Sequence, residues 1–129
     1  MSLNIRIKRT TGSSQKEEIV TVELEGSLDT STAPELENKL SAELDDQVKN
    51  LVFDLGKLTF ISSAGLRVFA ATRKFMNQRD EQVSFVNLQP QIREVFEIVK
   101  ALPGISVFGG IEEFDQYIAA RQRKVVEGE

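Results

Sequence analysis

Short apolar runs alternate with segments of helical periodicity along most of this chain, and this alternation limits the fold more than any other feature. The run LVFDL at 51–55 is almost continuously apolar, which is typical of a central strand that is covered on both faces. Before it, Leu36, Leu40 and Leu44 recur at four-residue spacing, a pattern that favours an amphipathic helix. Pro34 suits the first turn of such a helix. Strands that alternate with helices predict a mixed central β-sheet, parallel in its central part.

The predicted elements follow the order β-β-α-β-α-β-α-β-α. Strands are expected near 5–8, 19–24, 50–55, 81–88 and 105–109, and about four helices are expected to begin near 32, 63, 90 and 110 and to pack mainly on one side of the sheet. The polar loop between the first two strands predicts that they pair antiparallel. The fold class is therefore α/β. We expect a single domain over 1–129, with its core at 3–120 and a frayed tail at 121–129.

The composition argues against several classes of function. The net charge is −4, and a mildly acidic chain is a poor candidate for binding nucleic acid or an anionic membrane. The sequence contains no cysteine and no histidine, so disulfides, Cys/His zinc sites and a Ser-His-Asp triad are impossible. No apolar run approaches the length of a membrane span, and the N-terminus has no apolar signal region. These features favour a cytoplasmic protein without direct membrane insertion.

An unusual helix start follows the apolar run. The first turn of the helix expected near residue 63 would be built from Ser62, Ser63, Ala64 and Gly65. A glycine inside a helix costs about 1 kcal/mol relative to alanine, and an N-cap accounts for only one of the serines. The turn follows the carboxyl end of a central strand, where open α/β sheets meet ligands and partners. It is either an ordinary N-cap or a docking surface of small side chains that presents a serine hydroxyl.

The residues around this turn do not match known catalytic motifs. The G-x-S-x-G elbow is absent, no histidine can activate a serine, and Leu66 occupies the lysine position of an S-x-x-K motif. The phosphate-binding patterns G-x-x-x-x-G-K-[ST] and G-x-G-x-x-G are also missing. We therefore predict no catalytic residue, no metal site, no cofactor and no enzyme activity. Asp29 remains a further candidate, either as a turn or capping carboxylate before the first helix or, if it lies near the serine turn, as a functional one.

Three stretches resemble the STAS domain family, which is named for sulfate transporters and anti-sigma factor antagonists. LVFDLGKLTFISSAGLRVF at 51–69 resembles the family signature, in which an apolar strand ends in Asp before a small-residue turn opens a helix. GSLDTSTAPELENKL at 26–40 resembles the entry to the family's first helix, and 87–114 resembles its C-terminal half. The resemblance covers about residues 3–120, and it implies the STAS fold.

The form of this family without a transporter resembles bacterial anti-sigma factor antagonists. The resemblance implies a partner that is both an anti-sigma factor and a GHKL-type serine kinase. This kinase phosphorylates a serine at the start of the second helix and the complex dissociates, after which a PP2C-type phosphatase resets the switch. Phosphate there should leave the domain folded. By position, the phosphoacceptor is Ser63, with Ser62 as the alternative, and the strand-end aspartate is Asp54. The partner-binding residues implied are Asp29, Ser62, Ser63, Ala64, Gly65 and Arg67.

Two departures from the family pattern bear on the switch. Ser62 replaces a commonly acidic residue, and Ala64 replaces a common second serine. Ser62 therefore removes a negative charge beside Ser63 and adds a second possible acceptor. Since some family members are not phosphorylated, the alternative function is a constitutive STAS interaction subunit, such as a component of a lipid-transport ATPase complex or a signalling scaffold.

Overall fold

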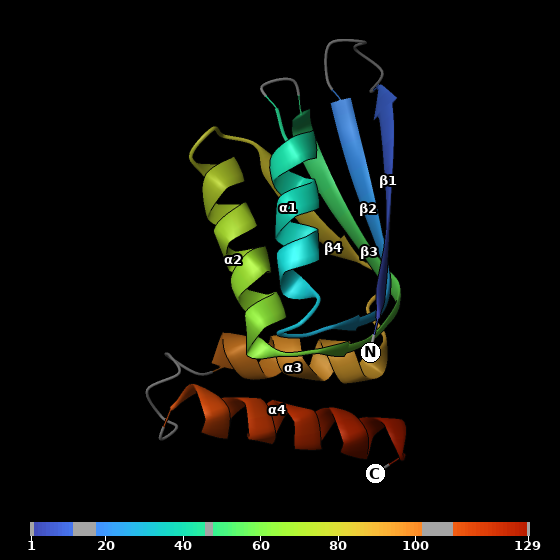
Figure 1. Ribbon diagram of the computed structural model, residues 1–129, viewed down its shortest axis with the longest axis vertical. Helices are drawn as coiled ribbons and strands as arrows, with labels where there is room; N and C mark the ends of the chain where they lie inside the picture. Colours follow the sequence, from blue (N-terminus) through green and yellow to red (C-terminus); the bar gives the residue numbers. More distant parts are fainter. Residues whose placement is uncertain (1, 12–17, 46–47, 102–109, 129) are drawn as a thin grey trace.

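A four-stranded mixed sheet forms the centre of the computed structural model, which describes residues 2–11, 18–45, 48–101 and 110–128 (Figure 1). The strand order is β1-β2-β3-β4, with bounds β1 (Leu3–Thr11), β2 (Glu18–Leu28), β3 (Val48–Ile61) and β4 (Gln82–Val86). β1 runs antiparallel to β2, whereas β2, β3 and β4 are parallel to one another. The predicted mixed sheet with an antiparallel first pair is confirmed.

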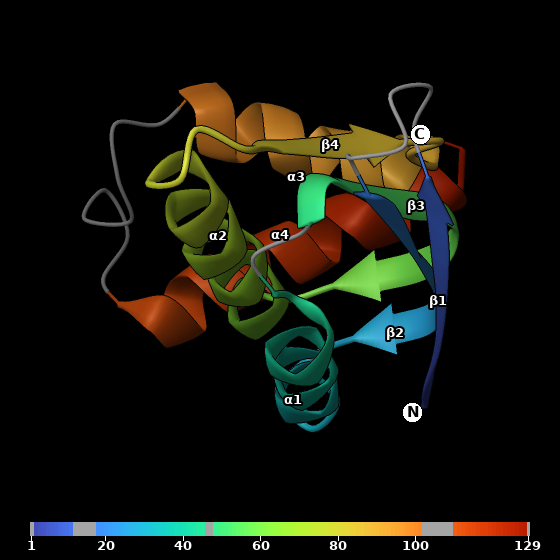
Figure 2. The same ribbon diagram turned by 90° about the horizontal axis from the view of Figure 1, so that it is seen from above.

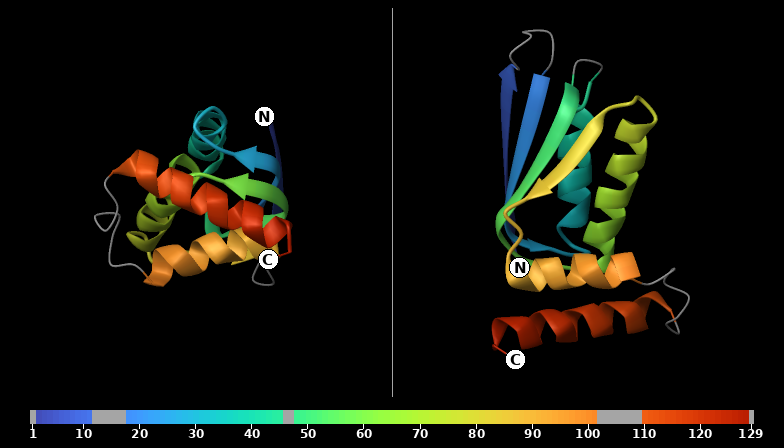
Figure 3. Two further views of the ribbon diagram at one scale, coloured as in Figure 1. Left: turned by 90° about the horizontal axis from the view of Figure 1, so that it is seen from below. Right: turned by 180° about the vertical axis from the view of Figure 1, so that it is seen from behind.

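The helices occupy two positions around this sheet. Their bounds are α1 (Ala33–Glu43), α2 (Ser63–Asn77), α3 (Pro90–Ala101) and α4 (Ile111–Val126). α1 and α2 lie side by side on one face of the sheet, and no helix of the described residues covers the opposite face (Figures 2 and 3). α3 and α4 lie across the edge at which β2 and β3 end (Figure 3). We call this the carboxyl edge.

The core lies between the sheet and the two face-packed helices. Along β3, Leu51, Phe53 and Leu55 are buried, whereas the intervening Val52 and Asp54 are only half-buried on the opposite face. The prediction that LVFDL is covered on both faces is therefore wrong, because the helices cover only one side. Alternation with a period of two is what a sheet with one solvated face requires.

Aromatic rings fill the part of the core nearest α3. The Phe53 ring stacks on the Phe85 ring of β4 with centroids 5.3 Å apart, and Phe69 of α2 lies 4.8 Å from Phe53. Phe96 of α3 meets Phe85 edge-on at 5.4 Å. Tilted and offset ring contacts of this kind add to the stabilisation from apolar burial. The cluster ties β3, β4, α2 and α3 into one core.

β3 is longer than its apolar run predicts. It continues through Gly56 to Ile61, and the register shifts along its pairing with β2 let the strand bend on the way. Asp54 consequently lies within the strand rather than at its end, so the strand-end assignment is wrong. Its Oδ1 accepts hydrogen bonds from the Gly56 N–H at 3.0 Å and the Asn87 side-chain amide at 3.2 Å.

The C-terminal part of the chain differs from its prediction in one respect. α4 continues to Val126, so the predicted frayed tail at 121–129 is wrong for 121–126. The reason is a tertiary contact. Gln122 is 2% exposed, and its side-chain amide pairs with both backbone groups of Ile61, at 3.0 Å to the N–H and 2.8 Å to the carbonyl oxygen.

The strand predicted at 105–109 lies outside the described residues. Over the ranges that the structure describes, no helix is long and apolar enough to cross a membrane.

Candidate functional site at the carboxyl edge

The loop after β2 and the start of α2 meet at the carboxyl edge. The Ser62 N–H donates a hydrogen bond of 2.9 Å to the carbonyl oxygen of Leu28, the last residue of β2. Asp29 follows Leu28 directly, so the parallel pairing of β2 and β3 places the Asp29 loop beside the serine turn. Sequence alone does not decide this proximity, because the two motifs are separated by an entire helix and strand.

The Asp29 carboxylate organises its own loop. Its Oδ1 accepts hydrogen bonds from the Ser31 N–H at 3.0 Å, the Ser31 hydroxyl at 2.8 Å and the Thr32 N–H at 3.1 Å. Burial opposes ionisation of this carboxyl, but the hydrogen bonds from Ser31 and Thr32 outweigh that effect and lower the pKa of Asp29 below its ordinary value. Asp29 thus orders the turn before α1, whose N-cap is Thr32 without a side-chain capping bond, and it remains half-buried beside the serine turn.

Ser63 is the first residue of α2, and it is covered rather than presented. Its side chain contacts Asp115 of α4, and the residue is only 6% exposed. The Ser63 N–H donates to Asp115 Oδ1 and the Ser63 hydroxyl donates to Asp115 Oδ2, both at 2.7 Å. One carboxylate therefore satisfies both the hydroxyl and a free backbone donor at the helix start.

Asp115 supplies a cap that α2 lacks locally. The first turn of this fully described helix contains no acidic residue, and Ser62 forms no side-chain capping bond. A carboxylate at a helix N-terminus is favourable because the backbone N–H groups carry partial positive charge there. The negative charge at this helix start therefore comes from α4. Sequence reasoning missed Asp115, whose only local signal is its place beside the buried Phe114 on an amphipathic helix.

Ser62 is also enclosed. Its backbone is extended, with φ −108° and ψ 177°, and the residue is 8% exposed. Its hydroxyl oxygen is buried without a hydrogen-bond partner among the described residues. A buried hydroxyl that lacks a hydrogen-bond partner is destabilising, so the Ser62 side chain lowers the stability of this turn.

The remaining predicted contact residues differ in accessibility. Gly65 is buried, and a Cβ at this position would lie 2.6 Å from Leu28 Cγ. Its small size therefore serves packing between α2 and the end of β2, which corrects the expectation that Gly65 faces a partner. Ala64 is half-buried against the core, and Arg67 is exposed. The predicted bare turn is wrong as a description of this structure, because α4 covers it.

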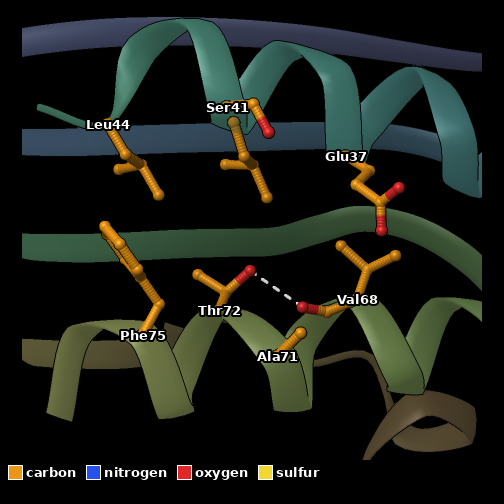
Figure 4. Close-up of a pocket in the computed structure, with 8 residues that line it drawn as sticks. Glu37, Ser41, Leu44, Val68, Ala71, Thr72 and Phe75 are labelled. Atoms are coloured by element: carbon orange, nitrogen blue, oxygen red, sulfur yellow. Dashed lines mark hydrogen bonds between the residues drawn. The ribbon is translucent and has the colours of Figure 1, made fainter. Parts of the chain in front are cut away.

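Two apolar hollows flank α2. The first, of about 300 Å³, separates α1 from α2 and is shown in Figure 4. It is lined by Glu37, Leu40, Ser41, Leu44, Val68, Ala71, Thr72 and Phe75. The second, of about 590 Å³, lies between α2, β4 and α3. In the first hollow the Thr72 hydroxyl donates a hydrogen bond of 2.8 Å to the Val68 carbonyl oxygen, so its hydrogen-bonding need is met within its own helix. No group of acidic side chains within the described ranges is arranged to hold a metal ion.

Comparison with known proteins identifies relatives along most of the chain. The model of the STAS domain family matches residues 13–114. A putative anti-sigma factor antagonist, BtrV of Bordetella bronchiseptica, is 41% identical over 75 residues, which cover 58% of this chain and 65% of the relative. An anti-sigma-B factor antagonist of Staphylococcus aureus is 30% identical over 96 residues, covering 74% of this chain and 85% of the relative. The chain thus spans just under two thirds of the first relative and most of the second.

Solved structures share the fold. The anti-sigma factor antagonist SpoIIAA in its unphosphorylated form superposes with a TM-score of 0.60 at 20% identity, over 74% of this chain and 83% of that protein. At this identity the likeness concerns the fold. An anti-sigma factor antagonist from Mycobacterium paratuberculosis has a TM-score of 0.58 at 25% identity, over 79% of this chain and 84% of that one.

Proposed function

The chain belongs to the STAS domain family, and on this premise we propose that it is a cytoplasmic anti-sigma factor antagonist that is released from its partner by phosphorylation of Ser63. It acts by binding and catalyses no reaction. Relatives named as anti-sigma factor antagonists, at 41% and 30% identity, favour antagonist function over a constitutive subunit. The observation that carries the proposal is the position of Ser63, as the first residue of α2 and beside the Asp29 loop.

The proposed docking surface comprises the Asp29 loop, the serine turn and Arg67. Arg67 lies four residues after Ser63, one helical turn further along α2, and is exposed. Its guanidinium offers charged, directional donors to a carboxylate of the partner. The partner we propose is an anti-sigma factor that is also a GHKL-type serine kinase, with a PP2C-type phosphatase removing the phosphate.

Phosphorylation acts through charge. A phosphoserine adds about −1.5 to −2 charge at neutral pH together with strong acceptor oxygens. At Ser63 this charge would lie beside Asp115 and next to the Asp29 loop. A partner surface shaped for a neutral hydroxyl would have to desolvate it. A loss of about 3 kcal/mol would weaken binding on the order of a hundredfold, which is enough to release the partner.

The test uses the GHKL-type serine kinases of the source organism, each purified and incubated with ATP and this protein. We expect one of them to bind the unmodified protein and to place phosphate on Ser63, as located by mass spectrometry. Ser63→Ala should bind and resist phosphorylation, and Ser62→Ala is the matched control that keeps the acceptor. Phosphate on Ser62 alone would refute the Ser63 assignment. Binding without phosphate on either serine would instead establish the constitutive subunit.

A further inference from the structure

We propose that α4 is an autoinhibitory cover over the serine turn, and that the contact between Asp115 and Ser63 is its latch. The cover is a property of the fold and can be tested without any partner. Its consequence for phosphorylation rests on the function proposed above. In this proposal Ser63 is inaccessible to a kinase in the closed form, and α4 must leave the turn before the phosphoryl group can be transferred.

The geometry of the latch supports closure. Asp115 uses both carboxylate oxygens on Ser63, one on the N–H and one on the hydroxyl, each at 2.7 Å. Hydrogen bonds to a charged acceptor are stronger than neutral ones. Phosphoryl transfer needs the acceptor oxygen in line with the γ-phosphorus of ATP, which requires an open approach to that oxygen. With Ser63 6% exposed and its hydroxyl directed at Asp115, that approach is blocked.

A second anchor holds the same face of α4. Gln122 lies seven residues after Asp115, which is about two helical turns, and its amide pairs with both backbone groups of Ile61. Ile118 lies between these two anchors and is fully buried. The Arg121 guanidinium also meets Glu94 of α3 at 3.1 Å. Besides this ion pair to α3, α4 therefore has a charged latch at Asp115 and a neutral anchor at Gln122, and these can be removed separately.

Phosphorylation would keep the cover open. The Ser63 oxygen forms a bond to the γ-phosphorus of ATP, the bond from that phosphorus to the β,γ-bridging oxygen breaks, and ADP leaves. The hydroxyl proton passes to the kinase's own base, so Asp115 Oδ2 loses its donor. The phosphate oxygens then compete for the N–H groups of the α2 N-terminus, which is a favourable site for an anion. They also repel the Asp115 carboxylate, so modification and closure exclude each other.

The cover can be measured with a thiol, because the chain contains no cysteine. In Ser63→Cys the single thiol takes the covered position, and its rate of reaction with a maleimide reports the opening of α4. We expect this rate to be about a hundredfold or more below that of the same variant unfolded in urea, since only the open form reacts. Adding Asp115→Ala or Gln122→Ala should raise the rate in the folded protein by about tenfold or more.

Comparing the two added substitutions separates the effect of α4 opening on the thiol rate from the effect of local charge. Removing Asp115 also removes a negative charge that suppresses thiolate formation, whereas removing Gln122 leaves the local charge unchanged. Glu112→Gln is the matched control, because it neutralises an exposed carboxylate in the first turn of the same helix. A folded rate equal to the unfolded one, or acceleration by Asp115→Ala alone, overturns the cover. If circular dichroism shows that Gln122→Ala is unfolded, Ile118→Val, which also leaves the charge unchanged, replaces it.

The kinase arm uses Asp115→Asn with native Ser63 and the kinase identified above. The cover predicts faster phosphorylation than in the wild type. Slower phosphorylation overturns the latch and would assign Asp115 as the acceptor of the serine proton. If no kinase modifies the protein at all, the proposed function fails, while the thiol rates still decide whether α4 covers the turn.

Discussion

Gly65 of α2 packs directly against Leu28 at the end of β2, where a methyl group at Gly65 would lie 2.6 Å from Leu28 Cγ and 2.8 Å from Cδ2. The Cγ1 of Ile61 would be 3.0 Å away. The first turn of α2 can therefore approach the sheet this closely only with glycine at this position.

Gly65→Ala is expected to destabilise the protein. Overpacking a closed core costs about 1–3 kcal/mol, and only about 1 kcal/mol of this is offset by the higher helix propensity of alanine. Chemical denaturation would measure the change. Gly110→Ala is the control, since among the described residues no atom beyond its chain neighbours lies within 4 Å of a Cβ built there. When Leu28→Ala is added, the combined loss of unfolding free energy should be smaller than the sum of the two separate losses. Strict additivity of the losses would contradict the contact.

Phe53→Ala is expected to cost about 3–5 kcal/mol of unfolding free energy, because Phe53 is fully buried and its ring contacts those of Phe69 and Phe85. Denaturant midpoints with an unchanged slope would establish this value. Phe75→Ala is the matched control on an aromatic that is 42% exposed, for which the loss should be under about 1 kcal/mol. Equal losses at the two positions would contradict the assignment of Phe53 to the core.

Asp29→Asn is expected to alter stability in a pH-dependent manner. At neutral pH it should cost about 1 kcal/mol, because hydrogen bonds to a charged acceptor are stronger than those to the neutral amide oxygen of Asn. The folded-state pKa of Asp29 is lowered, so the unfolded chain binds the proton first as pH falls below about 4. The contribution of the carboxylate is therefore present above pH 4 and is lost as pH falls through the folded pKa. Denaturation at pH 7 and at lower pH should show the gap between wild type and variant closing, and a constant gap would reject this role.

Ser63→Asp is expected to lower the melting temperature. The sequence alone suggests that charge at position 63 leaves the domain intact. In the structure, however, the new carboxylate would be buried against Asp115, and like charges at this distance repel. We expect a loss of about 1–3 kcal/mol, of the size found for unsatisfied buried polar groups. Asp115→Asn in the same chain should restore most of it, as measured by thermal unfolding. A fall that Asp115→Asn does not reverse would show that the repulsion is not the cause.

Local patterns in the sequence were sufficient to predict most secondary-structure elements. The leucine spacing and Pro34 located α1, the apolar patterns near 5–8 and 19–24 located β1 and β2, and the apolar run at 50–55 located the first part of β3. The bounds failed where tertiary contacts extend an element. Pairing with the end of β2 carries β3 on to Ile61, and the anchoring of Gln122 carries α4 on to Val126.

The sequence by itself determined which residues form the serine turn and that the turn opens a helix after a sheet strand, because capping and periodicity depend on neighbours in the chain. Only the tertiary structure decided what covers that turn. Asp115 lies far from Ser63 along the sequence, and no local pattern pairs them. Their contact exists because α4 packs across the carboxyl edge, where the buried Ile118 and the Gln122 amide set its position. Gly65 acquired its packing role in the same way, from the Leu28 side chain that the parallel pairing of β2 and β3 places beneath it.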